Sequence, residues 1–158
     1  MAFEIAVRPY DDADVLRMVD EVQAEYVVRY GGPDAAAVDP AEFSPPNGLF
    51  LVGILDGVPV AMGGWRRQSE TTAEIKRMYV VTGARRRGLA QRILTELERT
   101  AADAGITHLV LNTGPSQPEA ITMYRQAGYG AIPGFGHYAC TEDALFYGKT
   151  LQPEPAEH

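Results

Sequence analysis

The sequence contains one cysteine, Cys140, among its 158 residues. A single cysteine excludes an intramolecular disulfide and a cysteine-based zinc site. The histidines, His108, His137 and His158, lie far apart without metal-ligand spacing, so we predict no metal. No apolar stretch approaches the roughly 20 residues that span a bilayer, and residues 1–8 lack the apolar run of a signal peptide. We therefore expect a cytoplasmic protein with no membrane partner.

Length and composition favour one domain. A chain of 158 residues with 46% hydrophobic content can bury a substantial core but is short for two domains. We expect a single domain over residues 1–151 and a disordered tail over residues 152–158.

Charge is distributed unevenly along the chain. The formal net charge is −7, yet nine basic residues outnumber four acidic ones between Arg66 and Arg99. Nucleic-acid recognition calls for an extended positive face, whereas one basic stretch in an acidic chain suits a compact polyanion. We therefore predict no nucleic-acid partner. The acidic remainder would suit a cationic second substrate.

Apolar periodicity predicts alternating strands and helices. In the first half we expect a strand over 3–8, a helix capped by Asp11 or Asp12 and ending near Gly31, a short helical turn over 40–43, and a hairpin of strands 49–55 and 58–65 joined by Asp56-Gly57. In the second half we expect a strand over 73–81, a helix over 88–104, a strand over 108–111, a helix from a capping box at 116–119 to Ala127, a glycine- and aromatic-rich strand and loop over 129–138, and a strand over 144–151.

This order predicts an α/β fold with a mixed sheet and helices on both faces. One strand contradicts the simple pattern. Glu74, Lys76 and Arg77 would place charge on both faces of strand 73–81, which a central strand does not normally tolerate.

The segment Arg85-Arg86-Arg87-Gly88-Leu89-Ala90 places positive charge at the start of a predicted helix, and Arg92 adds a fourth guanidinium. A helix N-terminus already carries about half a positive charge, so a bound phosphate or pyrophosphate would turn repulsion into attraction. We expect Gly88 to let the anion approach the backbone and the amides from Arg86 to Gln91 to point at its oxygens, and we call this phosphate site the cradle. The alternative is a solvated arginine run at an ordinary helix entry.

The same segment fits the pattern Arg/Gln-x-x-Gly-x-Gly/Ala, and it follows Met78-Tyr79-Val80-Val81. A second block, Gln117-x-x-Ala120-Ile121-x-x-Tyr124-x-x-x-Gly128-Tyr129, lies downstream. With these motifs the sequence resembles the GNAT superfamily of acyl-CoA-dependent N-acyltransferases over most of its length.

The resemblance implies a mostly antiparallel, twisted sheet of about seven strands and an enzyme that uses acetyl-CoA. The acetyl group would move to the primary amine of a small molecule by direct attack in a ternary complex. The pantetheine arm would pair with the backbone of Met78 to Val80, at a splay between this strand and the one ending near Asn112. The implied cofactor-binding residues are Met78, Tyr79, Val80, Arg85, Arg86, Arg87, Gly88, Leu89, Ala90, Gln91, Asn112, Gln117 and Tyr124.

The resemblance makes Tyr124 a catalytic candidate that hydrogen-bonds the thioester sulfur and protonates the departing thiolate. A phenol with a pKa near 10 is a plausible donor to a thiolate with a pKa of about 8.5 to 10. A buried structural tyrosine is the alternative. Gln117 stands where relatives often use Asn to contact the cofactor, although a glutamine at a helix entry needs no functional explanation.

An amine must lose a proton before it attacks, so a base is expected directly or through water. Glu74 is the candidate, since several relatives place a glutamate there and strand periodicity gives it the same side-chain parity as Met78. The alternative is a structural ion pair. His137, Tyr138 or water could substitute, whereas Asn112 stands where some relatives carry a second glutamate.

Other functions and several properties stay open. A non-catalytic acyl-CoA sensor would keep the cradle, whereas other nucleotide-binding domains are disfavoured because neither Gly-x-x-x-x-Gly-Lys-Ser/Thr nor Gly-x-Gly-x-x-Gly occurs. The acceptor could be an amino acid or other small amine, an antibiotic amine or a protein amino group, with the loops 33–47 and 133–140 deciding. A homodimer is one option for the oligomeric state.

Overall fold

A computed structural model describes residues 2–35, 38–114, 117–139 and 144–151 of the chain. The predicted tail over 152–158, Cys140, and Ser116 of the predicted capping box lie outside these residues. None of the helices in the described ranges is long and apolar enough to cross a bilayer.

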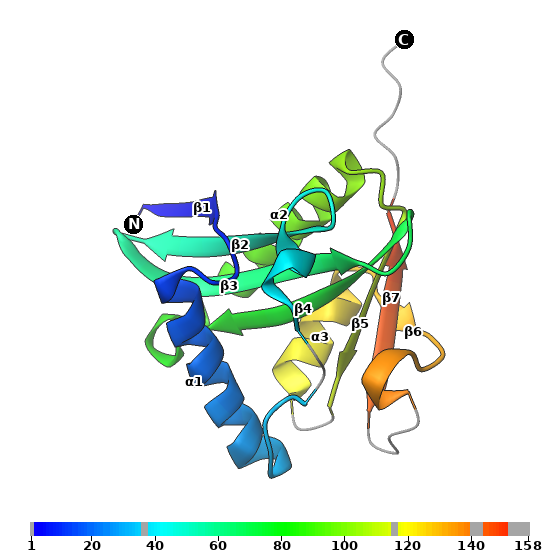
Figure 1. The fold of residues 1–158 in the computed structure, drawn as a ribbon. Coiled ribbons are helices and arrows are strands. Elements are labelled where there is room, and N and C mark those ends of the chain that lie inside the picture. Colours follow the sequence, from blue (N-terminus) through cyan, green and yellow to red (C-terminus); the bar gives the residue numbers. More distant parts are fainter. Residues whose placement is uncertain (1, 36–37, 115–116, 140–143, 152–158) are drawn as a thin grey trace.

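The described chain forms one seven-stranded sheet with the order β1-β2-β3-β4-β5-β7-β6 (Figure 1). β4 and β5 are parallel, and all other neighbours are antiparallel. The predicted mixed, mostly antiparallel sheet is confirmed. The strands are β1 (Phe3–Val7), β2 (Gly48–Leu55), β3 (Val58–Arg67), β4 (Thr72–Val80), β5 (His108–Thr113), β6 (Gly130–Ala131) and β7 (Leu145–Thr150).

Helices cover both faces of the sheet, as predicted. The first helix, α1 (Ala13–Tyr30), begins where the Asp12 carboxylate accepts the amides of Asp14 and Val15, and it ends at Gly31 with a left-handed φ of 81°. The remaining helical segments are α2 (Leu89–Asp103), α3 (Pro118–Gln126), and the 3-10 turns η1 (Pro40–Phe43), η2 (Thr82–Ala84) and η3 (Gly136–Tyr138).

Two hydrophobic clusters hold these layers together. On one face, α1 and η1 pack on the sheet through Met18, Phe43 and Phe50, which are almost fully buried. On the other face, α2 and α3 contribute side chains such as Leu97 and Tyr124 to the larger cluster. The sheet is therefore buried on both sides, and β4 lies at its centre.

The central strand β4 carries a one-residue irregularity. The register with β3 shifts between Met62 and Gly64, and Arg77 on the opposite strand has a φ of 62°. Such a bulge interrupts the alternation of side chains. Met78 consequently packs in the α2-side cluster and Tyr79 in the α1-side cluster.

The bulge corrects two expectations from the sequence. Glu74, Lys76 and Arg77 are 7%, 7% and 5% exposed, and all three bond to residues on the α1 face rather than dividing between the faces. Glu74 therefore lies on the face opposite to Met78, so the predicted parity is wrong. The central strand tolerates the charges because each one is ion-paired.

The strands β4 and β5 pair over a short distance only. Their parallel register runs from Thr72 opposite His108 to Glu74 opposite Val110. Beyond these residues the two strands diverge, and Figure 1 shows them opening toward α1 and α3. This opening, which we call the splay, is bordered by the second half of β4 and the end of β5.

Candidate active site

Five backbone amides at the start of α2 have no acceptor in the described part of the chain: those of Arg86, Gly88, Leu89, Ala90 and Gln91. The N-cap Gly88 provides no side-chain cap, and the first helical bond is the one from the Arg92 amide to the Gly88 carbonyl. Arg86 and Gly88 both adopt left-handed conformations, with φ of 66° and 75°. Turns of this kind direct successive N–H groups into one concavity, which is an anion site.

The arginine side chains do not all surround this concavity. Arg85 turns back toward β4 and α1, where its Nε donates to the Val80 carbonyl at 2.8 Å and its guanidinium pairs with Glu25. Arg92 lies over the Phe3 ring at 4.6 Å. Arg86 and Arg87 remain exposed beside the cradle. The predicted crowding of four guanidiniums at the helix pole is therefore wrong, and the unpaired amides are the stronger feature.

The edge of β4 offers a backbone donor to the splay. The Val81 amide bonds the Val60 carbonyl of β3 at 2.8 Å. Because antiparallel bonding alternates, the N–H and carbonyl of the preceding residue, Val80, point away from β3. The Val80 carbonyl accepts from Arg85, which confirms this direction. The Val80 N–H therefore points into the splay, six residues before Arg86, which provides the first unpaired amide of the cradle.

Tyr124 lies on α3 and belongs to the same cluster as Ile75 of β4 and Leu111 of β5. The tyrosine is 5% exposed, and its ring stands edge-on to that of Tyr129 with centroids 5.6 Å apart. Burial raises the pKa of Tyr124 well above its ordinary value of 10.0, and the nearby Tyr26 raises it further. The expectation of an ordinary phenol pKa is therefore wrong, because the site is desolvated.

The β5 side of the splay holds Asn112 and Gln117, both partly buried. Gln117 caps α3 and accepts a hydrogen bond from the Thr113 hydroxyl at 3.3 Å. Burial raises the pKa of Tyr30 at the end of α1, and the nearby Gln117 side chain partly lowers it. The Gln117 amide is thus partly engaged by the protein.

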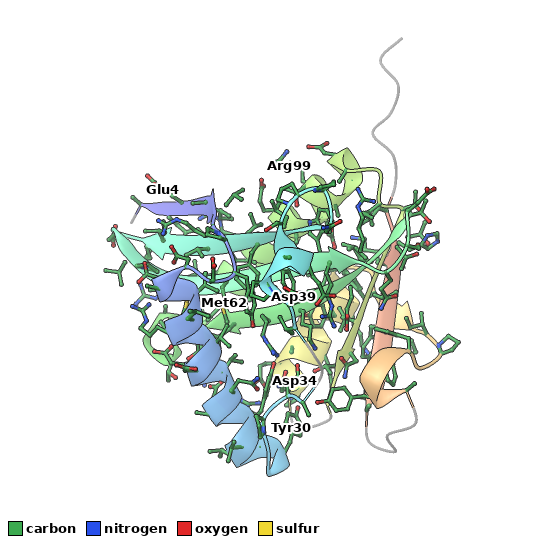
Figure 2. All side chains as sticks on the ribbon, viewed as in Figure 1. Glu4, Tyr30, Asp34, Asp39, Met62 and Arg99 are labelled. Atoms are coloured by element: carbon green, nitrogen blue, oxygen red, sulfur yellow. The ribbon has the colours of Figure 1, made fainter. Side chains whose placement is uncertain are left out.

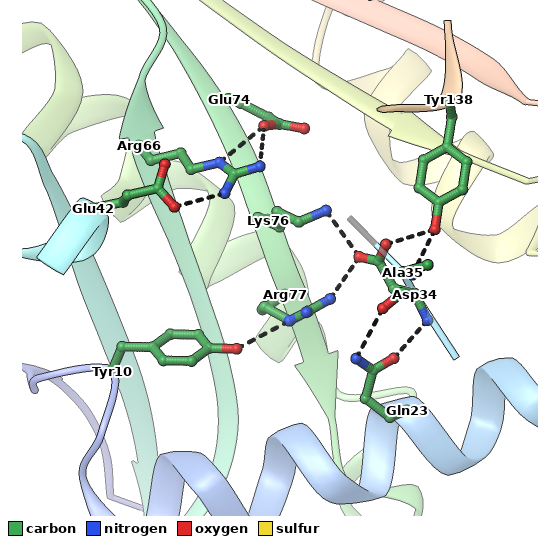
Figure 3. Close-up of polar contacts among 10 residues, drawn as sticks. All are labelled: Tyr10, Gln23, Asp34, Ala35, Glu42, Arg66, Glu74, Lys76, Arg77 and Tyr138. Atoms are coloured by element: carbon green, nitrogen blue, oxygen red, sulfur yellow. Dashed lines mark hydrogen bonds and ion pairs between the residues drawn. The ribbon is translucent and has the colours of Figure 1, made fainter. Parts of the chain in front are cut away.

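Glu74 lies at the last position where β4 pairs with β5, and it uses one of its two carboxylate oxygens. Its Oε1 accepts from Arg66 Nε at 3.1 Å and pairs with Arg66 Nη2 at 3.0 Å. Arg66 Nη1 also pairs with Glu42 at 3.1 Å (Figure 3). The second oxygen, Oε2, has no protein partner in the described ranges. Both the predicted ion pair and a free carboxylate oxygen are therefore present.

A buried ion-pair cluster that the sequence analysis did not identify lies beside Glu74. Asp34 Oδ2 accepts from Lys76 Nζ at 2.8 Å and from Arg77 Nη1 at 2.6 Å. Asp34 Oδ1 accepts from the Tyr138 hydroxyl at 2.7 Å, and Gln23 exchanges two bonds with the Asp34 backbone (Figure 3). The charged residues on a central strand indicate that buried ion pairs must form, but nothing local in the sequence indicates Asp34 as the partner of Lys76 and Arg77.

The cluster is connected electrostatically to Tyr124 through Tyr26 of α1. Burial raises the pKa of Tyr26 to about 12, while the charge of Arg77 lowers it and that of Asp34 raises it. Tyr26 in turn influences Tyr124. Figure 2 shows Asp34 and Tyr30 together at the C-terminal end of α1, the end that borders the splay.

The alternative bases His137 and Tyr138 lie on a different element from Glu74. Tyr138 and His137 lie in η3, and the Tyr138 hydroxyl is engaged by Asp34 and by the Ala35 amide at 2.8 Å. In the part of the chain that is described, no group of three or more His, Cys, Asp or Glu side chains is placed to hold a metal ion.

Comparison with known proteins adds independent support. The profile of the Acetyltransferase (GNAT) family matches residues 15–129. A protein from Azospirillum brasilense named IAA acetyltransferase is 31% identical over 144 residues, covering 90% of this chain and 94% of that protein.

Solved structures share the fold. A candidate acyl-CoA N-acyltransferase from Klebsiella pneumoniae has a TM-score of 0.81 at 24% identity, covering 95% of this chain and 98% of that one. PaiA N-acetyltransferase from Thermoplasma acidophilum, solved in complex with coenzyme A, has a TM-score of 0.72 at 16% identity, covering 95% and 99% of the two chains.

The family profile spans most of the described domain, and the Azospirillum relative matches nearly the whole chain. The motifs at 85–90 and 117–129, the splayed sheet and these matches lead to one conclusion. The chain belongs to the GNAT family of acetyltransferases.

Proposed function

We propose that this protein transfers an acetyl group from acetyl-CoA to the primary amine of a small molecule by direct attack in a ternary complex. One observation carries the proposal: the open edge of β4 that borders the splay leads through η2 to the unpaired amides at the start of α2. Few ligands present a diphosphate and an amide-bearing arm in that order, and coenzyme A does.

The proposed cofactor site divides the molecule of acetyl-CoA into two parts. The pyrophosphate would lie on the amides of Arg86 to Gln91, with Arg86 and Arg87 supplying exposed positive charge. The pantetheine arm would lie in the splay between Met78–Val80 and Asn112, as an additional strand. The coenzyme A present in the Thermoplasma relative supports this assignment.

The chemistry then needs charge stabilisation and three proton movements. The amine nitrogen, once neutral, attacks the thioester carbon, and the Val80 N–H is placed to stabilise the oxyanion. As the carbon–sulfur bond breaks, the sulfur gains a proton from Tyr124, and the second proton of the nitrogen passes to the resulting phenolate directly or through water. Tyr124, whose burial keeps its phenol protonated, donates a hydrogen bond to the sulfur and then the proton.

Glu74 is the proposed acceptor of the proton that the ammonium loses before attack. Arg66 fixes the carboxylate through Oε1 and leaves Oε2 with open lone pairs. Positioning of this kind is what a base requires, whether the proton moves directly or through one water. A non-catalytic acyl-CoA sensor would bind the cofactor equally well but would release no thiol in the presence of amines.

Gly88→Trp should abolish acetyl-CoA binding, because the indole would fill the concavity of the cradle. Among the described residues, no atom beyond the chain neighbours lies within 4 Å of a Cβ added at Gly88, so the domain should remain folded despite the φ of 75°. Gly105→Trp at the other end of α2 is the matched control, with a φ of 87° and the same open surroundings. Calorimetry should show binding lost only in the first variant, and retained binding would refute the cradle.

Tyr124→Phe should lower kcat by about 100-fold, within the usual range for loss of an acid, and leave the Kd for acetyl-CoA unchanged. Tyr129→Phe is the control. It removes the hydroxyl of the neighbouring ring, which points away from the splay and donates to Glu98 at 2.8 Å, and it should leave kcat unchanged. Since burial raises the pKa of Tyr124, activity should show no alkaline loss from this phenol below about pH 10. Unchanged turnover in Tyr124→Phe would remove the residue from the mechanism.

Glu74→Gln should lower kcat by about 100-fold at neutral pH, with partial recovery at high pH where more of the amine is already neutral. Glu42→Gln is a matched control because Glu42 also contacts Arg66 but is more exposed. Its pH–rate profile should match that of the wild type. Equal losses in both variants, with no change in pH profile, would assign Glu74 a structural role.

A further inference from the structure

Two small charge clusters lie side by side on the α1 face of β4, and their formal charges differ in sign. The Asp34 cluster, which consists of Lys76, Arg77 and Asp34, contains two cations and one carboxylate. The Arg66 cluster, which consists of Arg66, Glu74 and Glu42, contains one cation and two carboxylates. Figure 3 shows the two clusters following one another along the strand.

The Asp34 cluster has unused hydrogen-bond donors. Lys76 makes one bond with its three ammonium protons, and Arg77 bonds through Nε to the Tyr10 hydroxyl and through Nη1 to Asp34. Arg77 Nη2 has no partner in the described part of the protein. Neither cation has a carboxylate other than Asp34 within 4.0 Å among the described residues.

These donors belong to side chains that are almost fully buried, but no fully buried side-chain N or O atom in the described residues lacks a partner, so the unpaired Arg77 Nη2 keeps some accessible surface. The side chains of Lys76 and Arg77 are 6% and 4% exposed. A buried charge is costly unless it is paired and its donors are satisfied. Two buried cations that share a single oxygen of Asp34 therefore provide a favourable environment for one further anion.

The position of these donors on β4 suits contact with the acceptor substrate rather than with the cofactor. Arg77 immediately precedes Met78, where the proposed pantetheine site begins, whereas the cradle lies beyond Val80. Glu74, the proposed base, lies two residues before Lys76 on the same face, about 7 Å along a strand. An acceptor spanning these clusters would meet negative charge at its amine and positive charge at its other end.

We infer that Lys76 and Arg77 bind a carboxylate of the acceptor, so that the substrate is an amino acid or a similar small molecule carrying both an amine and a carboxylate. The inference rests on the proposed function. Asp34 already shows that both cations donate to a carboxylate oxygen, through charge-assisted bonds of 2.8 and 2.6 Å. The acceptor carboxylate would use the remaining donors, while its ammonium group faces Glu74.

The competing explanation is that the cluster only anchors the segment after α1 to the sheet. Asp34 does tie that segment to Gln23, Lys76 and Tyr138. An anchor would stabilise the fold for every substrate equally. A carboxylate site would instead discriminate between acceptors that differ in the carboxylate alone.

The test compares acceptors in the acetyl-CoA-dependent release of free thiol. A panel of L-amino acids is assayed beside the carboxamide and the decarboxylated amine of each one. The best amino acid should exceed both of its own analogues in kcat/KM by at least about 100-fold, since a site built to bond a group rejects molecules that lack it. Lys76→Met should remove this preference, Lys76→Arg should retain most of it, and the Kd for acetyl-CoA should not change.

Lys149→Met provides the control, because Lys149 of β7 pairs with Glu98 of α2 and lies outside both clusters. It should keep the preference. Turnover of carboxamides or plain amines as efficient as that of amino acids would overturn the inference and leave the proposed function standing. The same holds if Lys76→Met lowers kcat/KM equally for all acceptors. No thiol release with any amine, despite acetyl-CoA binding, would instead overturn the proposed function and the inference with it.

Discussion

The divergence of β4 from β5 after Glu74 is the constraint on which the site depends. Parallel pairing satisfies the facing edges of the two strands over three positions only. Beyond them, backbone groups such as the Val80 N–H lack a neighbouring strand, and an unmet backbone donor away from water costs free energy. A ligand that pairs with this edge of β4 provides the hydrogen-bond partners that a neighbouring strand would otherwise provide. The same strand then leads through η2 into the unpaired amides of α2.

The bulge at Arg77 connects this opening to the charges around it. A bulge bends its strand and increases the local twist, which is consistent with β4 leaving its neighbour at this point. It also brings Lys76 and Arg77 onto one face, where Asp34 can reach both. The bulge therefore lies between the two parts of the proposed site. The cationic donors precede Met78 in the sequence, and the proposed thioester site follows it.

The order and type of the main elements could be predicted from the sequence because apolar periodicity and caps are local. Helix α2 was expected over 88–104 and spans Leu89–Asp103, and η1 has the predicted bounds Pro40–Phe43. The strand expected within 129–138 is reduced to Gly130–Ala131. The motif at 85–90 correctly indicated a helix start with unpaired amides.

Side-chain directions at the site could not be predicted in the same way. Strict period-two reasoning fails after a one-residue bulge, so Glu74 and Met78 were expected on one face and lie on opposite faces. Asp34, the partner of Lys76, is 42 residues away in sequence. The Arg85 side chain turns away from the cradle because it pairs with Glu25, 60 residues earlier. Only the tertiary structure brings such groups together.

Amide hydrogen exchange, measured residue by residue with and without coenzyme A, tests the central claim most directly. Bound cofactor should slow exchange at the Val80 amide and at the amides of Arg86 and Gly88 to Gln91, because each would gain an acceptor. The amides of β1, the edge strand that is separated from β4 by β2 and β3, should exchange at unchanged rates. Saturating coenzyme A that leaves Val80 and the start of α2 unprotected would contradict the account.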